Sequence, residues 1–150
     1  TVNAVSKTYA MTGWRLGYLV AKGCALEQLL KVHQYVQACA CSISQAAALA
    51  AITGPQDCVD LMRDEFRSRR DLLVNGFREM GVDLIEPDGA FYIFPRVGDG
   101  DAVAAALGKA GVITVPGSAF GPGGKEHIRI SYAAARSELI EALRRLKDIL

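Results

Sequence analysis

The segment NAVSKTYAMTGWRLGY, residues Asn3–Tyr18, carries two cations within a stretch of small, apolar and glycine residues. Lys7 stands eight positions before Arg15, and no Asp or Glu occurs in the chain before Glu27. A solvated protein surface normally mixes charges of both signs, and these two side chains have no acidic neighbour in the sequence. The pattern predicts that they bind an anion that is not part of the segment.

A lysine and an arginine together suit a ligand that carries both an aldehyde and a phosphate. A lysine amine attacks an aldehyde in its uncharged form, which a nearby cation such as Arg15 favours. The planar guanidinium of arginine donates two parallel hydrogen bonds to a phosphate, and the Ser6 hydroxyl lies one residue from Lys7. Pyridoxal 5'-phosphate is a cofactor that carries both groups, and we expect it to be the ligand.

The longer string is more specific than the Ser-Lys pair. Ser6-Lys7 followed by Ala10-Met11-Thr12-Gly13-Trp14-Arg15-Leu16-Gly17-Tyr18 resembles the cofactor-lysine segment of the class I and II aminotransferases, which are fold type I pyridoxal-phosphate enzymes. The resemblance implies that Lys7 forms the covalent bond to the cofactor and that Arg15 binds its phosphate. The family usually has Gly or Ser three residues before the lysine. Ala4 stands there, so Ser6 is a weaker candidate for that hydroxyl contact.

Later motifs resemble landmarks of the same family in the same order. They are Gln45-Ala46-Ala47, Arg69-Arg70-Asp71, Gly89 to Pro95 (GAFYIFP), Pro116-Gly117 with Phe120-Gly121, and Arg129-Ile130-Ser131-Tyr132. In the family, the arginine of the last motif binds the substrate α-carboxylate, which implies that role for Arg129. A bidentate contact from a rigid strand would orient the Cα–H bond of the substrate. Tyr92 and Phe120 either border this site or belong to the packed core.

The resemblance places the chain in the C-terminal portion of such an enzyme. It implies an α/β fold: a small α/β domain, with a short mixed or antiparallel sheet covered by helices, preceded by a fragment of the large cofactor domain. The break at Gly54-Pro55 leads us to expect the large-domain fragment over residues 1–55 and the small domain over residues 56–150. Family residues that hold the cofactor ring would lie upstream of Thr1, so we expect the 150 residues alone to be inactive.

Hydrophobic periodicity predicts the individual elements. We expect a strand tail at residues 1–5, helices over 25–39, 42–52, 57–80 and 102–110, and a last helix with Ser137 as its N-cap. We expect further strands over 16–21, 82–85, 91–94, 112–115 and 127–132. The strand at 16–21 and the two helices between residues 32 and 56 read as buried, and the arginines of the long helix read as its solvent-exposed face.

Composition limits the other functions that are open to the chain. A formal net charge of +1 and a pI near 7.6 give no field to attract nucleic acid, so we expect no nucleic-acid partner. Polar residues interrupt the uncharged stretch over 32–56, which argues against a membrane span. The four cysteines have no spacing typical of a metal site, so we expect no metal, small buried thiols and a cytoplasmic location.

The sequence thus predicts a pyridoxal-phosphate-dependent aminotransferase. Its substrates would be an amino acid and a 2-oxo acid, and the complete protein would be a homodimer. Two alternatives stay open: a lyase or decarboxylase of the same fold, or a non-catalytic aminotransferase-like sensor domain of a transcription regulator.

Overall fold

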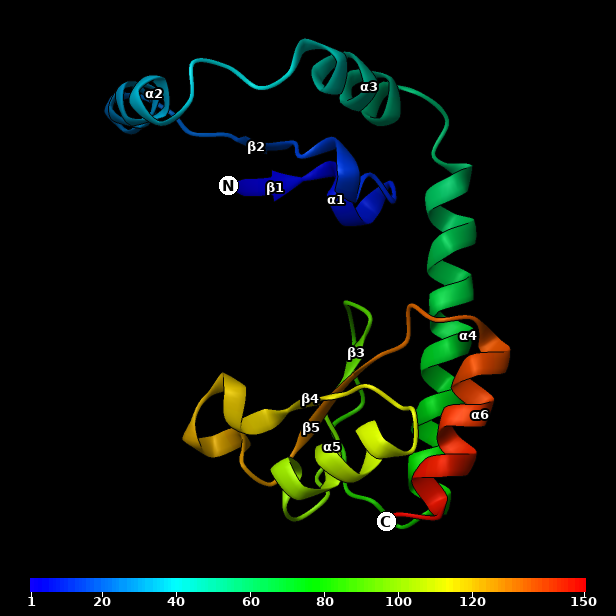
Figure 1. The fold of residues 1–150 in the computed structure, drawn as a ribbon. Helices are drawn as coiled ribbons and strands as arrows, with labels where there is room; N and C mark the ends of the chain where they lie inside the picture. The colour runs from blue at the N-terminus through cyan, green and yellow to red at the C-terminus, as the bar shows by residue number, and fades with distance from the viewer. The chain divides into compact units, whose positions relative to one another are not determined.

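A computed structural model describes all residues from Thr1 to Leu150 (Figure 1). The chain forms two compact units, Thr1–Met62 and Arg63–Leu150. The first contains β1 (Val2–Ala4), α1 (Val5–Thr8), the 3-10 turn η1 (Thr12–Trp14), β2 (Gly17–Leu19), α2 (Cys24–Val36) and α3 (Ser42–Thr53). Helix α4 (Asp57–Glu79) begins in the first unit and continues into the second.

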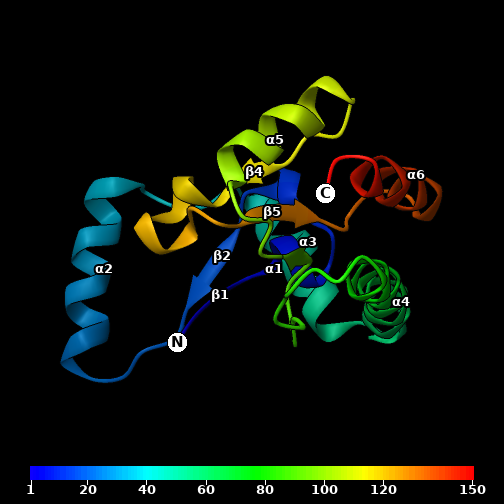
Figure 2. The ribbon, with the colours of Figure 1, turned by 90° about the horizontal axis from the view of Figure 1, so that it is seen from below.

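Strands β1 and β2 form an antiparallel ribbon (Figures 1 and 2). The register pairs Val2 with Leu19, Asn3 with Tyr18 and Ala4 with Gly17. Gly17 suits this register because a Cβ there would lie 3.1 Å from the carbonyl oxygen of Asn3. The ribbon therefore joins the segment before Lys7 to the segment after Arg15.

A small apolar core holds the turn that follows β1 against α3. Val5 and Met11 pack with Ala48 of α3, and all three are buried. Alanine at this point of α3 has no side chain beyond Cβ, so the turn and the helix can approach each other closely. The Ala-rich stretch of the sequence is thus used where it meets the segment that carries Lys7.

The second unit is built on a three-stranded antiparallel sheet in the order β3-β5-β4. Its elements are β3 (Tyr92–Ile93), α5 (Gly100–Lys109), β4 (Val115–Pro116), the 3-10 turns η2 (Gly117–Phe120) and η3 (Pro122–Gly124), β5 (Ile128–Ser131) and α6 (Arg136–Lys147). Residues of β5 alternate in burial: Ile128 and Ile130 are buried, Arg129 is half-buried and Ser131 is exposed. Strands turn successive side chains to opposite faces, so the two isoleucines share one face and Arg129 lies on the other.

The isoleucine face of the sheet is covered by helices. Ile128 and Ile130 belong to one core cluster with Phe77 of α4, Leu107 of α5 and Leu146 of α6. Helix α6 runs beside α4 (Figures 1 and 2), and a Cβ on Gly76 would reach within 2.7 Å of the Leu143 side chain. This packing leaves the face with Arg129 outside the main core.

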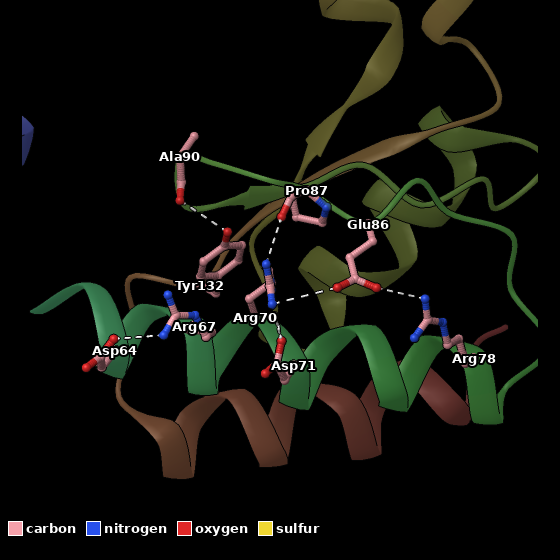
Figure 3. Close-up of polar contacts among 9 residues, drawn as sticks. All are labelled: Asp64, Arg67, Arg70, Asp71, Arg78, Glu86, Pro87, Ala90 and Tyr132. Carbon is pink, nitrogen blue, oxygen red and sulfur yellow. Dashed lines mark hydrogen bonds and ion pairs between the residues drawn. The ribbon is translucent and has the colours of Figure 1, made fainter. Parts of the chain in front are cut away.

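Arg70 fastens the segment before β3 to α4 (Figure 3). Its guanidinium pairs with Asp71 at 2.8 Å and lies 3.7 Å from Glu86, and Nη1 donates to the carbonyl oxygen of Pro87 at 3.3 Å. The buried Tyr132 donates its hydroxyl hydrogen to the carbonyl oxygen of Ala90 at 3.1 Å. Burial raises the pKa of Tyr132, so this hydroxyl is held in its neutral, donating form.

The arginines of α4 correct one expectation. The side chains of Arg69 and Arg70 are only 20% and 22% exposed, so they are not part of a solvent-exposed face. Arg69 donates to the carbonyl oxygen of Ala134 at 2.8 Å. Within the landmark Arg69-Arg70-Asp71, Arg69 therefore joins α4 to the segment that follows β5, and Arg70 joins α4 to the segment that precedes β3.

Several boundaries also differ from the sequence predictions. Residues 82–85 form no strand: Asp83 accepts one hydrogen bond from the amide of Arg96, Ile85 faces solvent, and Pro87 has no N–H to extend a ladder. Helix α6 is capped at Ala135, whose amide donates to the Glu138 carboxylate at 3.0 Å, and not at Ser137.

Expected burial in the first unit is wrong at three places. Strand β2 is exposed along its length, and its sheet contains no strand besides β1. No residue of α2 is buried. All four cysteines are free and exposed, not buried. In neither unit do the length and hydropathy of any helix suffice for it to cross a membrane.

Candidate active site

Lys7 lies in the one-turn helix α1, directly after the end of β1. Its side chain is exposed, whereas Val5 in the same turn is fully buried and anchors the turn. The amide of Tyr9 donates to the carbonyl oxygen of Val5 at 3.2 Å, which closes the turn. The Tyr9 hydroxyl then donates to Gln56 Oε1 at 3.0 Å, beyond the end of α3. The backbone that carries Lys7 is thus fixed at several points, whereas the residue as a whole is exposed.

Arg15 lies at the end of η1, two residues before β2. Its backbone is left-handed, with φ of 52°, and its Nη1 donates to the carbonyl oxygen of Thr12 at 3.1 Å. A non-glycine residue in this conformation costs about 1 kcal/mol, so the surrounding turn must impose it. The hydrogen bond to Thr12 leaves most donors of the guanidinium available.

The ribbon brings the two cations to the same end. Because β1 and β2 are antiparallel, Ala4 at the end of β1 pairs with Gly17 at the start of β2. Lys7 follows Ala4 by three residues and Arg15 precedes Gly17 by two, and the turns α1 and η1 that carry them contact each other. The structure therefore gathers Lys7 and Arg15 from eight positions apart in the sequence.

Ser6 accompanies Lys7 in α1 and is half-buried. Ala4, which takes the place of the usual Gly or Ser of the family, has an amide that donates to Asn3 Oδ1 at 2.8 Å. Two hydroxyls therefore flank Lys7 in sequence, the half-buried one of Ser6 and the exposed one of Thr8.

Arg129 occupies the central strand of the second unit's sheet, on the face opposite Ile128 and Ile130. Its guanidinium carbon lies 4.4 Å from the centre of the Tyr92 ring and 4.8 Å from the centre of the Phe120 ring. Sequence reasoning left open whether these two aromatics border the site or fill the core. They lie against Arg129, and the antiparallel register of β3 and β5 is the signal that would have placed Tyr92 there.

Arg129 also differs from most arginines of its unit in having no acidic partner. Carboxylates lie within 4.0 Å of Arg63, Arg67, Arg69, Arg70, Arg78, Arg96, Arg144 and Arg145. Arg136 donates to Ser68. Arg129 is half-buried and has ring contacts but no recorded ion pair. Its hydrogen-bonding edge is therefore free to receive an external carboxylate.

Close backbone contacts hold the loop that carries Phe120. A Cβ on Gly117 would overlap the carbonyl oxygen of Gly124 and would lie 2.7 Å from the carbonyl oxygen of His127. The amide of Gly117 donates to that same His127 oxygen at 2.8 Å. The sequence analysis placed Gly117 only within a family landmark and did not single out Gly124, but the crossing of two backbones requires glycine at both positions.

The donor set fits an aldehyde that carries a phosphate. One end of the ribbon presents a primary amine, a guanidinium and a hydroxyl, from Lys7, Arg15 and Ser6. An amine bonds covalently to an aldehyde, and a guanidinium and a hydroxyl donate hydrogen bonds to phosphate oxygens. No group of three or more His, Cys, Asp or Glu side chains is placed to hold a metal ion.

This fold and these residues define the class to which the chain belongs. The family described as aminotransferase class I and II matches residues 1–146, and the chain is a member of it. Members of this family depend on pyridoxal phosphate. The α/β fold is that of the C-terminal part of a fold type I enzyme.

Individual relatives carry several specific names. The chain is 46% identical to a probable aspartate aminotransferase of Methanocaldococcus jannaschii, covering 99% of this chain and 42% of the relative. It is 42% identical to a probable N-acetyl-LL-diaminopimelate aminotransferase of Bacillus subtilis, covering 97% and 38%. The crystal structure of an aromatic aminotransferase from Pyrococcus horikoshii superimposes with a TM-score of 0.93 at 41% identity, covering 100% and 42%. The chain thus spans about two fifths of the length of these relatives.

Proposed function

We propose that the protein containing this chain is an aminotransferase that moves an amino group between an L-amino acid and a 2-oxo acid. The observation that carries the proposal is the Ala4–Gly17 pairing, which brings the backbone segments that carry Lys7 and Arg15 to one end of the ribbon. The ring contacts of Arg129, in the absence of an acidic partner, support a carboxylate-binding role in the same reaction.

In this proposal, three residues of the first unit hold the cofactor. Lys7 binds it covalently, Arg15 donates to its phosphate, and Ser6 is the weaker candidate for a further phosphate contact. Bound pyridoxal phosphate supplies an aldehyde that accepts the amino group and a ring that withdraws electrons from the substrate Cα. Once the substrate amine has taken the place of Lys7, the Lys7 Nζ atom is free to take the proton from the substrate Cα.

Arg129 acts on the substrate in this scheme. Two parallel hydrogen bonds from its guanidinium to the α-carboxylate fix two atoms of the substrate. Only rotation about a few bonds of the substrate then has to be restrained. The Cα–H bond is then oriented for transfer of its proton to Lys7 Nζ. Lys7 Nζ would pass this proton on as the amino group is transferred, and in the second half-reaction, when a 2-oxo acid with the same carboxylate binds, Lys7 Nζ would deliver a proton to its Cα.

The domain assignment belongs to the same proposal. Residues 1–55 form the C-terminal fragment of the large cofactor-binding domain, and residues 56–150 form the small C-terminal domain. The two compact units, which divide after Met62 within α4, support an assignment of this kind. The names of the relatives, both aminotransferases, support class 2.6.1 as the activity of the whole protein.

The whole protein is proposed to be a homodimer. In the first unit, an apolar hollow lies between the ribbon and helices α2 and α3, lined by residues such as Leu19, Leu30 and Leu49. Tyr35 and Val36 of α2 are 94% and 79% exposed. Apolar surface of this kind favours association with more protein. A cytoplasmic location is proposed on the four free cysteines, which suit a reducing compartment.

Borohydride reduction of the complete holoenzyme tests the proposal. Reduction makes the bond between a lysine amine and the cofactor permanent, and peptide mass mapping then identifies the lysine. The expected result is a pyridoxyl group on Lys7, with loss of the label and of turnover in Lys7→Ala. A pyridoxyl group on Lys22 or Lys31 would overturn the assignment.

A further inference from the structure

The structure assigns Tyr92 and Phe120 as positioning residues that hold the Arg129 guanidinium ready for the substrate carboxylate. The inference rests on the proposed function, because it takes Arg129 to bind that carboxylate. It adds two residues that act on the substrate through the arginine.

The two rings reach Arg129 from the two strands that flank it. In the order β3-β5-β4, Tyr92 belongs to β3, and Phe120 ends the turn η2 that directly follows β4. Tyr92 pairs with Ser131, two residues from Arg129, so the tyrosine and the arginine share a face of the sheet. Their separations from the guanidinium carbon, 4.4 Å and 4.8 Å, are within the range of cation–π contacts.

Ring contacts restrain an arginine without consuming its hydrogen bonds. The five N–H groups of a guanidinium point outward in its plane, whereas the attraction to an aromatic face uses its positive charge. A carboxylate partner would restrain Arg129 as well, but it would compete with the substrate for the same N–H groups. Arg129 has the rings and no recorded ion pair, whereas Arg70 in the same unit is held by Asp71 and Glu86.

Burial alone does not explain the position of Phe120. The residue is 54% exposed, so its ring is not placed there by the main core. Phe94 meets it edge-on, with ring centres 6.1 Å apart, and stacks on His127 at 4.8 Å with an interplanar angle of 4°. This support, together with the Gly117–Gly124 backbone crossing, fixes the loop from which Phe120 reaches the guanidinium.

The consequence for binding is entropic and geometric. A free arginine side chain must give up many rotamers when it forms a bidentate pair, and a restrained one has already lost them. Removing either ring should therefore weaken interactions that depend on the substrate carboxylate. It should leave interactions with the rest of the substrate much less affected.

The test compares each amino acid with the amine that lacks its α-carboxylate. Single-turnover kcat/KM is measured in the complete holoenzyme for two substrate pairs, L-tyrosine with tyramine and L-aspartate with β-alanine. The variants are then compared on the pair that the wild-type enzyme turns over measurably. The preference is the ratio of the two values. Tyr92→Leu and Phe120→Leu each remove a ring, and Tyr92→Phe and Phe120→Tyr are matched controls that keep it.

We expect each Leu variant to lower the preference for the amino acid about tenfold, as expected for one cation–π contact, and each ring-keeping variant to retain it within about twofold. A binding measurement without turnover should agree. The dissociation constant of α-methyl-L-tyrosine or α-methyl-L-aspartate, which have no Cα hydrogen, should rise by a similar factor in the Leu variants. Adding Phe120→Leu to Arg129→Gln should change the preference no further, because the ring acts through the arginine.

The outcomes separate this inference from the proposed function. If Arg129→Gln leaves the preference unchanged, the carboxylate role of Arg129 is wrong and the inference fails with it. If Arg129→Gln abolishes the preference but both Leu variants retain it, only the positioning role is wrong. Equal losses in the Leu and the ring-keeping variants would also overturn it. Because Phe120 is half-exposed, Phe120→Leu is expected to fold, and its cofactor absorbance and melting temperature verify this.

Discussion

Ala4 and Gly17 are register partners in the β1–β2 ribbon, and this one pairing determines where Lys7 and Arg15 lie. Lys7 follows Ala4 by three residues and Arg15 precedes Gly17 by two, so neither can move far without breaking the register. The Gly17 position is close to the opposite strand: a Cβ would lie 3.1 Å from the carbonyl oxygen of Asn3. The proposed cofactor site therefore depends on the backbone register at Gly17 as well as on Lys7 and Arg15.

Gly17→Val should weaken cofactor binding while leaving Lys7 and Arg15 chemically intact. The branched side chain must push the strands apart at the Ala4–Gly17 pair, which displaces the two turns relative to each other. We expect the pyridoxal phosphate dissociation constant, from absorbance titration of the apoenzyme, to rise at least about tenfold. Gly13→Ala is the matched control, since a Cβ at Gly13 meets nothing within 4 Å. Equal affinities in the two variants would contradict the role of the register.

Arg15→Gln and Arg129→Gln should fail in different ways. Loss of Arg15 would remove the proposed phosphate contact, so the cofactor should dissociate more readily while the substrate affinity of the loaded enzyme changes less. Loss of Arg129 should leave the cofactor bound but lower kcat/KM for the amino acid. The decrease should correspond to a loss of about 2 to 4 kcal/mol of transition-state stabilisation by charged hydrogen bonds. Absorbance titration and steady-state kinetics on the same preparations distinguish the two patterns. Arg129→Lys should recover little, because a point charge does not reproduce the planar fork.

Much of the fold was predictable because its signals are local. The apolar repeat from Val59 to Phe77 predicted α4 nearly to its last residue, and the alternation around Ile128 and Ile130 predicted β5 and its buried face. Strand formation at residues 82–85 was predicted wrongly because pairing is not local. That segment has strand-like residues, but its backbone hydrogen bonds run from the Val82 amide to Phe77 of α4 and from the Arg96 amide to Asp83, and they form no strand ladder.

The residues of the candidate site also differ in whether their signals are local in the sequence. The string around Lys7 and the motif at Arg129 are contiguous in sequence, so resemblance to a family identified them directly. The roles of Tyr92 and Phe120 depend on the strand order β3-β5-β4, which no short stretch of sequence encodes. The glycines at 117 and 124 are likewise explained only by a backbone crossing between distant parts of one loop.

Gly117→Ala should strongly destabilise the protein. Its Cβ would overlap the Gly124 carbonyl oxygen, and a rigid backbone has no low-energy way to yield. We expect a loss of roughly 3 kcal/mol in the free energy of unfolding, measured by denaturant titration. Gly108→Ala is the matched control, because a Cβ there meets nothing within 4 Å and alanine favours the helical conformation of α5 by about 0.5 to 1 kcal/mol. Similar losses in both variants would contradict the crossing as the cause.

Glu141 should make the stability of α6 depend on pH in the acid range. Hydrogen bonds from Arg144 and Arg145 lower the pKa of Glu141 from 4.5 to about 2. The unfolded chain therefore binds the proton more readily, so the contribution of Glu141 is present above pH 4.5 and disappears as the pH falls to about 2. An NMR titration of the Glu141 carboxyl carbon should show the low midpoint, and Arg144→Met should raise it. A midpoint near 4.5 in the unaltered protein would contradict these contacts.

Arg70→Met should reduce stability without changing how the enzyme treats the substrate carboxylate. The Arg70 side chain is 22% exposed and contacts Asp71, Glu86 and Pro87, so its loss leaves Asp71 without its cation and Glu86 with Arg78 alone. We expect a decrease of about 1 to 3 kcal/mol in the free energy of unfolding. The preference for L-tyrosine over tyramine, or for L-aspartate over β-alanine, should stay within about twofold of the wild-type value, unlike in Arg129→Gln. A loss of that preference at unchanged stability would mean that Arg70, and not only Arg129, serves the substrate carboxylate.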